Sequence, residues 1–329
     1  MKKLNLPYLQ IEPSTVCNYT CGFCVGRHMA QRHITLDTFQ QVLESIYGLK
    51  HISIQGEGEP LLNPQFFDMV KIVRLLHPDA SVSFITNGSL FSAENVDHIL
   101  SNRIARIMVS IESADSATFK EIRGGKLEKV TKGIRMLLKE RSRQGLTSPV
   151  VGFAVTIMKR TMNDFKDIVS LYHDLELDGG IACQYLQQME IYSNIYDNDM
   201  KTQMLSSSEI SWFDELRSNS PEIKQLSRLA DNDSNFYTNL LGSESEGCPW
   251  LENGLFVNTA GIATGCCQIK EAETRGFGIL TEFTSEVVAA KRSEMQTQLI
   301  SGLIPGGCAN CPIAISVQDN FLLKQQSIV

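Results

Sequence analysis

The sequence lacks any long apolar run. Its apolar stretches are far shorter than the roughly 18 residues that a membrane-spanning helix requires. No sustained apolar stretch follows Lys2 and Lys3, as it would in a signal peptide. We therefore expect a cytoplasmic protein with no membrane partner. A basic excess is missing as well, because the formal net charge is −7, and this weighs against a nucleic-acid partner.

Internal repeats and low-complexity segments are also absent, and the composition is that of an ordinary folded chain. With 329 residues, 43% of them apolar and 20% charged, the chain is long enough for one large α/β domain and a small second unit. Cysteine is the residue type that stands out. Nine cysteines in a chain expected in the reducing cytoplasm indicate metal binding rather than disulfide bonds.

Short β-like runs alternate with amphipathic helical segments from about residue 7 to residue 186. Most of these runs are nearly continuous in apolar residues, as expected for parallel strands covered by helices. Six strand–helix units in succession predict an α/β fold, a partial (β/α)6 barrel of the TIM type, with ligands at the carboxyl ends of its strands. The expected strands are 7–12, 51–55, 81–86, 106–112, 150–158 and 180–186.

The pattern changes after residue 187. A polar, turn-rich stretch and two helical segments come first, followed from Cys248 by a hairpin with Gly261 at its turn, a helix near 285–302 and a final C-x2-C pair. We therefore expect three units along the chain. These are a barrel (1–190), a helical linker (191–247) and a small cysteine-rich α+β domain (248–329).

Three cysteines stand close together directly after the first expected strand. Cys17, Cys21 and Cys24 have the spacing C-x3-C-x2-C, at the end of the strand where such a barrel carries its chemistry. A structural zinc site would need a fourth protein ligand, and none is obvious nearby. An iron–sulfur cluster held by three thiolates instead leaves one iron open to another ligand.

This spacing, together with "GEGEPLLNP" at 56–64, resembles the radical S-adenosylmethionine (SAM) superfamily. The resemblance implies a [4Fe-4S] cluster on the three cysteines, whose open iron binds S-adenosylmethionine and cleaves it to a 5′-deoxyadenosyl radical. Gly58 and Glu59 match the family turn that holds the methionine ammonium, while Glu57 replaces a glycine expected there. The resemblance also suggests cofactor contacts for Phe23 beside the adenine, Asn87 and Ser110 around the methionine and ribose, and Arg123 at the carboxylate.

Five more cysteines, at 248, 266, 267, 308 and 311, form a second group near the C-terminus. Their spacing alone permits a zinc site of four thiolates. The segment from Cys248 to Cys266 also fits C-x(9–15)-G-x4-C, the start of a module that many radical SAM enzymes append. The resemblance is to its half-sized form, called Twitch, and implies an auxiliary [4Fe-4S] cluster on Cys248, Cys266, Cys308 and Cys311 that transfers electrons. Cys267 is the alternative to Cys266 as ligand, and the spacing favours Cys266.

Cys183 stands apart from both groups, in the sixth expected strand. It is either a small core residue or the hydrogen-atom donor of a radical reaction, and the strand pattern leaves open which face it occupies. A thiol donor returns a hydrogen atom to a substrate radical from the opposite face and so inverts the carbon. Without a donor, a radical beside a hydroxyl loses an electron and becomes a ketone.

These resemblances point to the Twitch-bearing carbohydrate epimerases and dehydrogenases, such as the hygromycin-type epimerases. We predict epimerisation of a small hydroxylated substrate, a sugar or aminocyclitol unit as in antibiotic biosynthesis, with Cys183 as the donor. The alternatives are an alcohol dehydrogenase that uses the auxiliary cluster as electron acceptor, and an epimerase or maturase of a ribosomal peptide. We expect little room before Cys17 for a peptide-recognition domain, which weighs against the peptide. A flavodoxin or ferredoxin is the expected electron donor.

Overall fold

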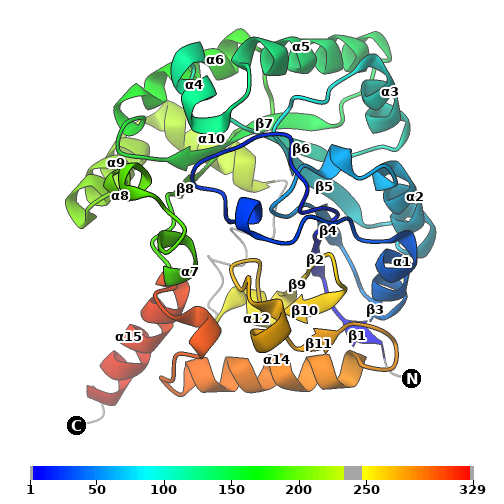
Figure 1. Cartoon of the computed structure of the whole chain (residues 1–329), viewed down its shortest axis with the longest axis vertical. Coiled ribbons are helices and arrows are strands. Elements are labelled where there is room, and N and C mark those ends of the chain that lie inside the picture. The colour runs from blue at the N-terminus through cyan, green and yellow to red at the C-terminus, as the bar shows by residue number, and fades with distance from the viewer. Residues whose placement is uncertain (1–2, 233–246, 327–329) are drawn as a thin grey trace.

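The computed structural model describes residues 3–232 and 247–326. Within these ranges nine strands form one sheet, in the order β11-β10-β9-β2-β4-β5-β6-β7-β8, with helices along its outer side (Figure 1). A separate parallel pair consists of β1 (Leu4–Asn5) and β3 (Ile46–Tyr47). The strands of the large sheet are β2 (Tyr8–Ile11), β4 (His51–Ile54), β5 (Ser81–Thr86), β6 (Arg106–Ser110), β7 (Val150–Ile157), β8 (Ile181–Tyr185), β9 (Gly254–Val257), β10 (Ile262–Thr264) and β11 (Gly278–Ile279).

Helices connect the parallel strands and form the outer layer. Those of the barrel are α1 (Leu36–Glu44), α2 (Phe66–Leu76), α3 (Ala93–Ser101), α4 (Ser116–Arg123), α5 (Leu127–Arg143) and α6 (Phe165–Asp174). The later ones are α7 (Glu190–Ser193), α8 (Asn198–Thr202), α9 (Ser207–Asn219), α10 (Pro221–Asn232), α12 (Pro249–Asn253), α13 (Ala272–Arg275), α14 (Ser285–Ile300) and α15 (Pro312–Gln326). Short 3-10 helices are η1 (Val25–His28), η2 (Pro60–Leu62), η3 (Met162–Asp164) and η4 (Gly306–Cys308).

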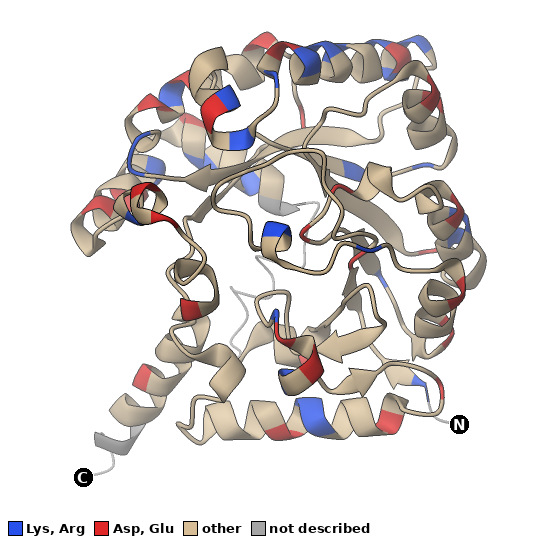
Figure 2. Ribbon diagram, in the orientation of Figure 1, with Lys and Arg blue, Asp and Glu red and all other residues tan. Residues whose placement is uncertain are grey.

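Local sequence signals account for several of the barrel helices. Thr35, Ser92 and Asp115 precede α1, α3 and α4, and the side chain of each accepts a hydrogen bond from the backbone N–H three residues later. The apolar side of each helix packs on the sheet. Phe66 of α2, for example, meets Phe84 of β5 with ring centroids 5.1 Å apart. The charged residues lie mostly on the helices and loops (Figure 2), so the core lies between the helices and the strands.

The predicted α/β fold is confirmed. Strands β2, β4, β5, β6, β7 and β8 are the six expected strands, differ from the predicted ranges only at their ends, and pair in parallel in chain order. Strands β8 and β11 are the two edges of the sheet, so the barrel is partial. In the described part of the chain, every helix is too short or too polar to cross a membrane. Residues 233–246 of the expected linker lie outside the described residues.

The C-terminal hairpin is an extension of the barrel sheet. Strands β9 and β10 are antiparallel, as predicted, and Gly261 between them has a φ of +77°, a conformation that favours glycine. Strand β9 also pairs in parallel with β2, with Tyr8 opposite Gly254 and Ile11 opposite Val257. The sheet therefore continues from the barrel into the segment that carries the second cysteine group.

Glu12 lies buried where β2, β4 and β9 end. Its backbone N–H donates to the Val257 carbonyl at 2.8 Å, and its Oε1 accepts a hydrogen bond of 2.8 Å from the Glu57 N–H. Its Oε2 is buried and has no hydrogen-bond partner among the described residues. Burial raises the pKa of Glu12 to about 7, because the charged carboxylate loses its hydration.

We predict that Glu12 makes the protein less stable as the pH rises from about 5 to about 8. Between the ordinary pKa of 4.5 and the raised value, the folded state keeps a proton that the unfolded state releases. Rising pH therefore favours unfolding, by up to roughly 3 kcal/mol at about 1.4 kcal/mol per pKa unit.

Urea unfolding near pH 5 and near pH 8 checks this prediction. The free energy of unfolding should fall with pH in the wild type and fall much less in Glu12→Gln, which keeps an acceptor for the Glu57 N–H. An equal fall in both proteins would show that Glu12 is not the group responsible.

Candidate functional site

The segment 12–24, named here the cysteine loop, follows β2 and carries Cys17, Cys21 and Cys24, the N-terminal cysteines. It crosses the open end of the barrel (Figure 1). Burial raises the pKa of the Cys24 thiol, and the neighbouring Glu57, Cys21 and Cys17 raise it further, so the three thiols share one electrostatic environment. Two donors point at Cys17 Sγ, the Tyr19 N–H at 3.5 Å and Asn87 Nδ2 at 3.8 Å.

The cysteine loop is held by residues 56–60, named here the GEGEP turn, which follow β4. The Gly58 N–H donates to the Ser14 carbonyl at 3.0 Å, and the Glu59 N–H donates to the Val16 carbonyl at 2.9 Å. A Cβ on Gly58 would lie 2.5 Å from the Ser14 oxygen. Only glycine allows this approach, which explains why the position carries no side chain.

Glu59 ties the GEGEP turn to the end of β5. Its side chain is 1% exposed, and its two oxygens accept hydrogen bonds of 2.7 Å from the Thr86 hydroxyl and from the Asn87 N–H. Asn87 in turn donates to Asn18 Oδ1 at 2.9 Å, beside Cys17. Glu59 therefore also holds Asn87 in place through a hydrogen bond within the protein, a role that the sequence did not indicate.

Arg123, the last residue of α4, lies beside the N-terminal cysteines. It is 6% exposed and pairs with Glu112 at 2.5 Å, while its carbonyl accepts a hydrogen bond of 3.0 Å from the Thr20 N–H. Burial opposes its charge, but Cys21 and Glu112 outweigh burial and hold the pKa of Arg123 above its ordinary value. Its buried Nε has no hydrogen-bond partner among the described residues, so a spare donor is available for an anionic ligand group.

The other two residues predicted to contact the cofactor are Phe23, directly before Cys24, and Ser110. Phe23 is half-buried and packs where two clusters of apolar side chains meet. Ser110 ends β6 on the interior face of the sheet, where it lies beside Ala154 of β7. Gly58, Glu59, Asn87 and Arg123 therefore gather at the N-terminal cysteines, and Ser110 borders the barrel interior.

Cys183 lies on the opposite face of the sheet from Ser110. In β8 it shares a face with Ile181 and Tyr185, because side chains alternate along a strand. The Tyr185 ring packs against Phe213 of α9 with centroids 6.1 Å apart, so this face meets the helices. The interior face carries Gln184 instead, which donates to the Thr156 hydroxyl at 3.2 Å. A hydrogen-atom donor has to face the reaction cavity, and the position of Cys183 weighs against that role.

The second cysteine group comes from three separate segments. Cys248 precedes α12 and its N–H donates to Gln296 of α14 at 3.0 Å. Cys266 follows β10, whose Thr264 hydroxyl donates to the Cys266 carbonyl at 2.9 Å. Cys308 ends η4, and the Cys311 N–H donates to the Cys308 carbonyl at 3.0 Å. The strand pairing of β9 with β2 attaches these segments to the barrel sheet, and the Trp250 ring after Cys248 packs on Tyr8 at the start of β2.

The thiols of this group lie within electrostatic reach of one another. Burial raises the pKa of Cys266, and the neighbouring Cys267, Cys248 and Cys308 raise it further. The pKa of Cys308 is likewise raised by burial, by Cys311 and by Cys248. The set Cys248, Cys266, Cys308 and Cys311, named here the auxiliary cysteines, is thus brought together. All-thiol donor sets of this kind hold iron–sulfur clusters or structural zinc. Among residues 3–232 and 247–326, no three His, Cys, Asp or Glu side chains come close enough to share a single metal ion.

A buried ion pair joins the two regions. Lys270 Nζ lies 2.5 Å from Glu57 Oε1, with side chains 7% and 18% exposed. Burial opposes the charge of Lys270, yet Glu57, Tyr192 and Cys267 outweigh burial and hold its pKa well above the ordinary value. The only sequence signal for this pair was the replacement of the expected glycine by Glu57, because nothing in the sequence around Lys270 indicates its partner.

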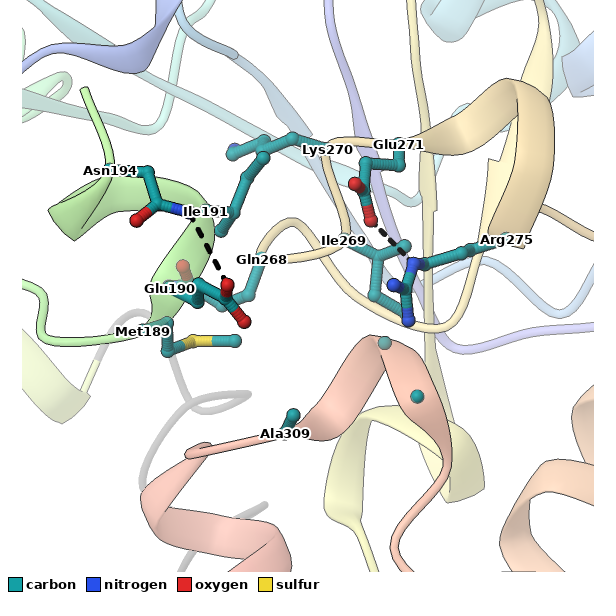
Figure 3. A pocket seen from close by; sticks show the side chains of 12 residues that line it. Met189, Glu190, Ile191, Asn194, Gln268, Ile269, Lys270, Glu271, Arg275 and Ala309 are labelled. Carbon is teal, nitrogen blue, oxygen red and sulfur yellow. Dashed lines mark hydrogen bonds and ion pairs between the residues drawn. The ribbon is translucent and has the colours of Figure 1, made fainter.

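A cavity of about 210 Å³ lies beside this ion pair, between α7, the loop 268–271, Arg275 and the segment 306–309 (Figure 3). Its lining mixes polar and charged side chains with apolar ones. Glu190 accepts a hydrogen bond of 3.4 Å from Asn194, and Glu271 pairs with Arg275. Lys270 and Gln268 belong to the wall, and Gln268 accepts a hydrogen bond of 2.6 Å from the Tyr192 hydroxyl.

Several curated proteins are similar to part of the chain. The tungsten-containing aldehyde ferredoxin oxidoreductase cofactor-modifying protein of Pyrococcus furiosus is 26% identical over 187 residues, which are 55% of this chain and 52% of that protein. The GTP 3′,8-cyclase of Peptoclostridium acidaminophilum is 30% identical over 179 residues, 52% of this chain and 53% of the cyclase. The chain spans about half the length of these curated relatives.

The fold is shared with solved structures. Streptococcus suis SuiB bound to S-adenosylmethionine superposes with a TM-score of 0.64 at 14% identity, over 94% of this chain and 71% of that chain. The sequence of residues 11–172 matches the profile of the radical SAM superfamily, whose members use a [4Fe-4S] cluster and S-adenosylmethionine. The match contains the cysteine loop from Ile11 on, the GEGEP turn and Arg123. The chain therefore carries a domain of the radical SAM superfamily.

Proposed function

We propose that this protein is a radical SAM enzyme that abstracts a hydrogen atom from a carbinol carbon of a small hydroxylated substrate and oxidises it. The observation that carries the proposal is the gathering of four thiols from three segments, in a unit whose strand β9 pairs with β2 of the barrel. A second redox centre at this place suits a reaction in which the substrate gives up an electron after losing a hydrogen atom.

Cys17, Cys21 and Cys24 would hold the first [4Fe-4S] cluster, with S-adenosylmethionine at its open iron. Together these groups, when bound, supply a 5′-deoxyadenosyl radical. The residues of the chain orient them. The spare Nε donor of Arg123 suits the carboxylate of S-adenosylmethionine, and Asn87, supported by Glu59, directs its amide toward Cys17. Gly58 leaves room for the cysteine loop, and Phe23 and Ser110 are proposed for the adenine and ribose.

The auxiliary cysteines would hold the second [4Fe-4S] cluster, in a module of the Twitch type. We favour Cys266 over Cys267 as the fourth ligand. Cys248 and Cys308 raise the pKa of Cys266 electrostatically, so the three thiols are neighbours. Cys267 acts electrostatically on Lys270 and Tyr192. We propose the units 1–190, 191–247 and 248–329 for the barrel, linker and module. The pairing of β9 with β2 supports a module that folds onto the barrel rather than an independent domain.

A sugar or aminocyclitol ring is the proposed substrate. The size and the mixed charges of the cavity beside Lys270 support this class, since carboxylate, amide and guanidinium groups recognise hydroxyls and amines. One side of its wall includes Lys270, whose ion-pair partner Glu57 lies beside Cys24. Another side is formed by Gly306, Gly307 and Ala309, which flank Cys308. The cavity therefore lies close to both cysteine groups.

The orientation of Cys183 supports oxidation over epimerisation, because a thiol on the helix side of β8 does not face the substrate. The substrate loses one hydrogen atom, one electron and the hydroxyl proton, and a ketone remains. Epimerisation is the second candidate. It is supported by Cys267, a half-buried thiol within electrostatic reach of Lys270 and next in sequence to Gln268 of the cavity wall, which would be the donor in place of Cys183.

We predict that Cys266→Ala loses roughly half of the iron and sulfide, because one of two four-iron clusters loses a ligand. Cys267→Ala is the matched control and should keep the full content. Iron and sulfide analysis of anaerobically reconstituted protein measures both. Bound zinc without iron, or equal iron loss in both variants, would contradict the assignment of the auxiliary cysteines.

We predict that Cys183→Ala leaves product formation close to the wild-type rate. Candidate sugars, aminocyclitols and peptides are incubated with reductant, either dithionite or a flavodoxin or ferredoxin, in deuterated water. Oxidation yields a ketone without deuterium, whereas epimerisation through an exchangeable thiol places one deuterium at the inverted carbon.

Mass spectrometry of the product separates these outcomes. A deuterated epimer that is lost in Cys183→Ala would restore the donor role of that residue. A deuterated epimer that is lost only in Cys267→Ala would establish the second candidate. Turnover of a peptide alone would move the substrate class away from sugars.

A further inference from the structure

The ion pair between Glu57 and Lys270 spans the two cysteine groups. Glu57 belongs to the GEGEP turn after β4, and Lys270 follows Cys266 by four residues in the loop after β10. Their charged atoms are 2.5 Å apart and both side chains are largely buried. A buried pair adds little net stability when compared with apolar residues of the same size, so its place in the molecule calls for another explanation.

Glu57 touches a predicted cluster ligand with its remaining oxygens. Its Oε2 and its backbone carbonyl oxygen each lie 3.7 Å from Cys24 Sγ. Cluster binding requires Cys24 as a thiolate, which places a second negative charge next to the Glu57 carboxylate. Two like charges at this distance, shielded from water, repel strongly unless a cation offsets one of them.

Lys270 provides that cation and is held firmly in place. Its Nζ lies 5.9 Å from the ring centroid of Tyr192 and 5.7 Å from that of Phe256, both favourable distances for a cation over an aromatic ring. It also attracts the buried carboxylate of Glu12, whose Oε1 accepts the Glu57 N–H. The stem of Lys270 reaches this position from the cavity wall (Figure 3).

We propose that Lys270 is a positioning residue that neutralises Glu57 beside Cys24 and thereby sets the reduction potential of the cluster on the N-terminal cysteines. This inference rests on the proposed function, because it assumes a cluster at Cys17, Cys21 and Cys24. It goes further by giving the second cysteine region a direct electrostatic effect on the first. A neighbouring cation favours the more negative, reduced state of a cluster, so its loss makes reduction harder.

The test is an EPR-monitored potentiometric titration of the full chain, reconstituted with iron and sulfide. The signal that changes when S-adenosylmethionine is added identifies the N-terminal cluster. In Lys270→Met, which keeps the apolar stem on Tyr192 and Phe256, we expect its potential to become more negative. A tenfold change in the one-electron equilibrium, which is about 59 mV, is the expected minimum.

Two further variants predict directions for the change in reduction potential that a purely structural role of the ion pair would not produce. Glu57→Gln leaves the cation of Lys270 without its carboxylate partner, so the potential should become more positive. The double variant Glu57→Gln with Lys270→Met removes both charges and should return close to the wild-type potential. Lys71→Met, which breaks the exposed pair with Asp68 on α2, is the matched control and should change nothing.

Unchanged potentials in both single variants, with only a lower melting temperature, would overturn the inference and leave the pair as a structural contact. Should Lys270→Met fail to fold, a positive shift in Glu57→Gln still supports the inference and no shift overturns it. A wild-type protein without any signal that responds to S-adenosylmethionine would instead contradict the proposed function. The two failures are therefore distinguishable, since the second appears before any variant is made.

Discussion

Two backbone hydrogen bonds between the GEGEP turn and the cysteine loop organise the candidate site. The N–H groups of Gly58 and Glu59 donate to the carbonyls of Ser14 and Val16, and the absence of a side chain at Gly58 allows the two segments to approach. This contact fixes the loop from which Cys17 extends. The same turn carries Glu59, whose buried carboxylate supports Asn87, and Glu57, which touches Cys24. Ligand geometry and electrostatics thus depend on one short turn.

The pairing of β9 with β2 is the second contact on which the candidate site depends. It joins segments that are more than two hundred residues apart in sequence, since Ile11 lies opposite Val257. Because the strands are parallel, their carboxyl ends lie at the same edge of the sheet, and the residues that follow each strand become neighbours. Glu12 follows β2 and the turn between β9 and β10 follows β9, so these two segments are neighbours. The same pairing attaches the loop after β10 to the barrel, and the charge of Lys270 in that loop reaches Glu12.

Buried charge is concentrated around the N-terminal cysteines. The pairs Glu57–Lys270 and Glu112–Arg123 flank the cysteine loop, and each joins side chains that are largely withdrawn from water. Desolvation makes such pairs poor sources of stability. Beside thiols that must carry negative charge to bind iron, however, two cations provide the compensation that water provides elsewhere. The two buried ion pairs therefore place their cations where thiolates are expected.

Much of this protein follows from local sequence. The apolar strand runs and capped helices determine the partial barrel, and C-x3-C-x2-C with the GEGEP turn determines the radical SAM domain, because these features depend on neighbours in the chain. The sequence also identified Glu59, Asn87 and Arg123, whose gathering at Cys17 and Cys21 the structure describes. Tertiary structure alone decided which face of β8 Cys183 occupies, since alternation divides a strand into two faces without saying which one meets the helices. It alone decided the partners of Glu57 and Glu12 as well, because Lys270 reaches them only after β9 has paired with β2. The physical reason is that a long-range contact depends on how distant segments pack, which no local pattern records.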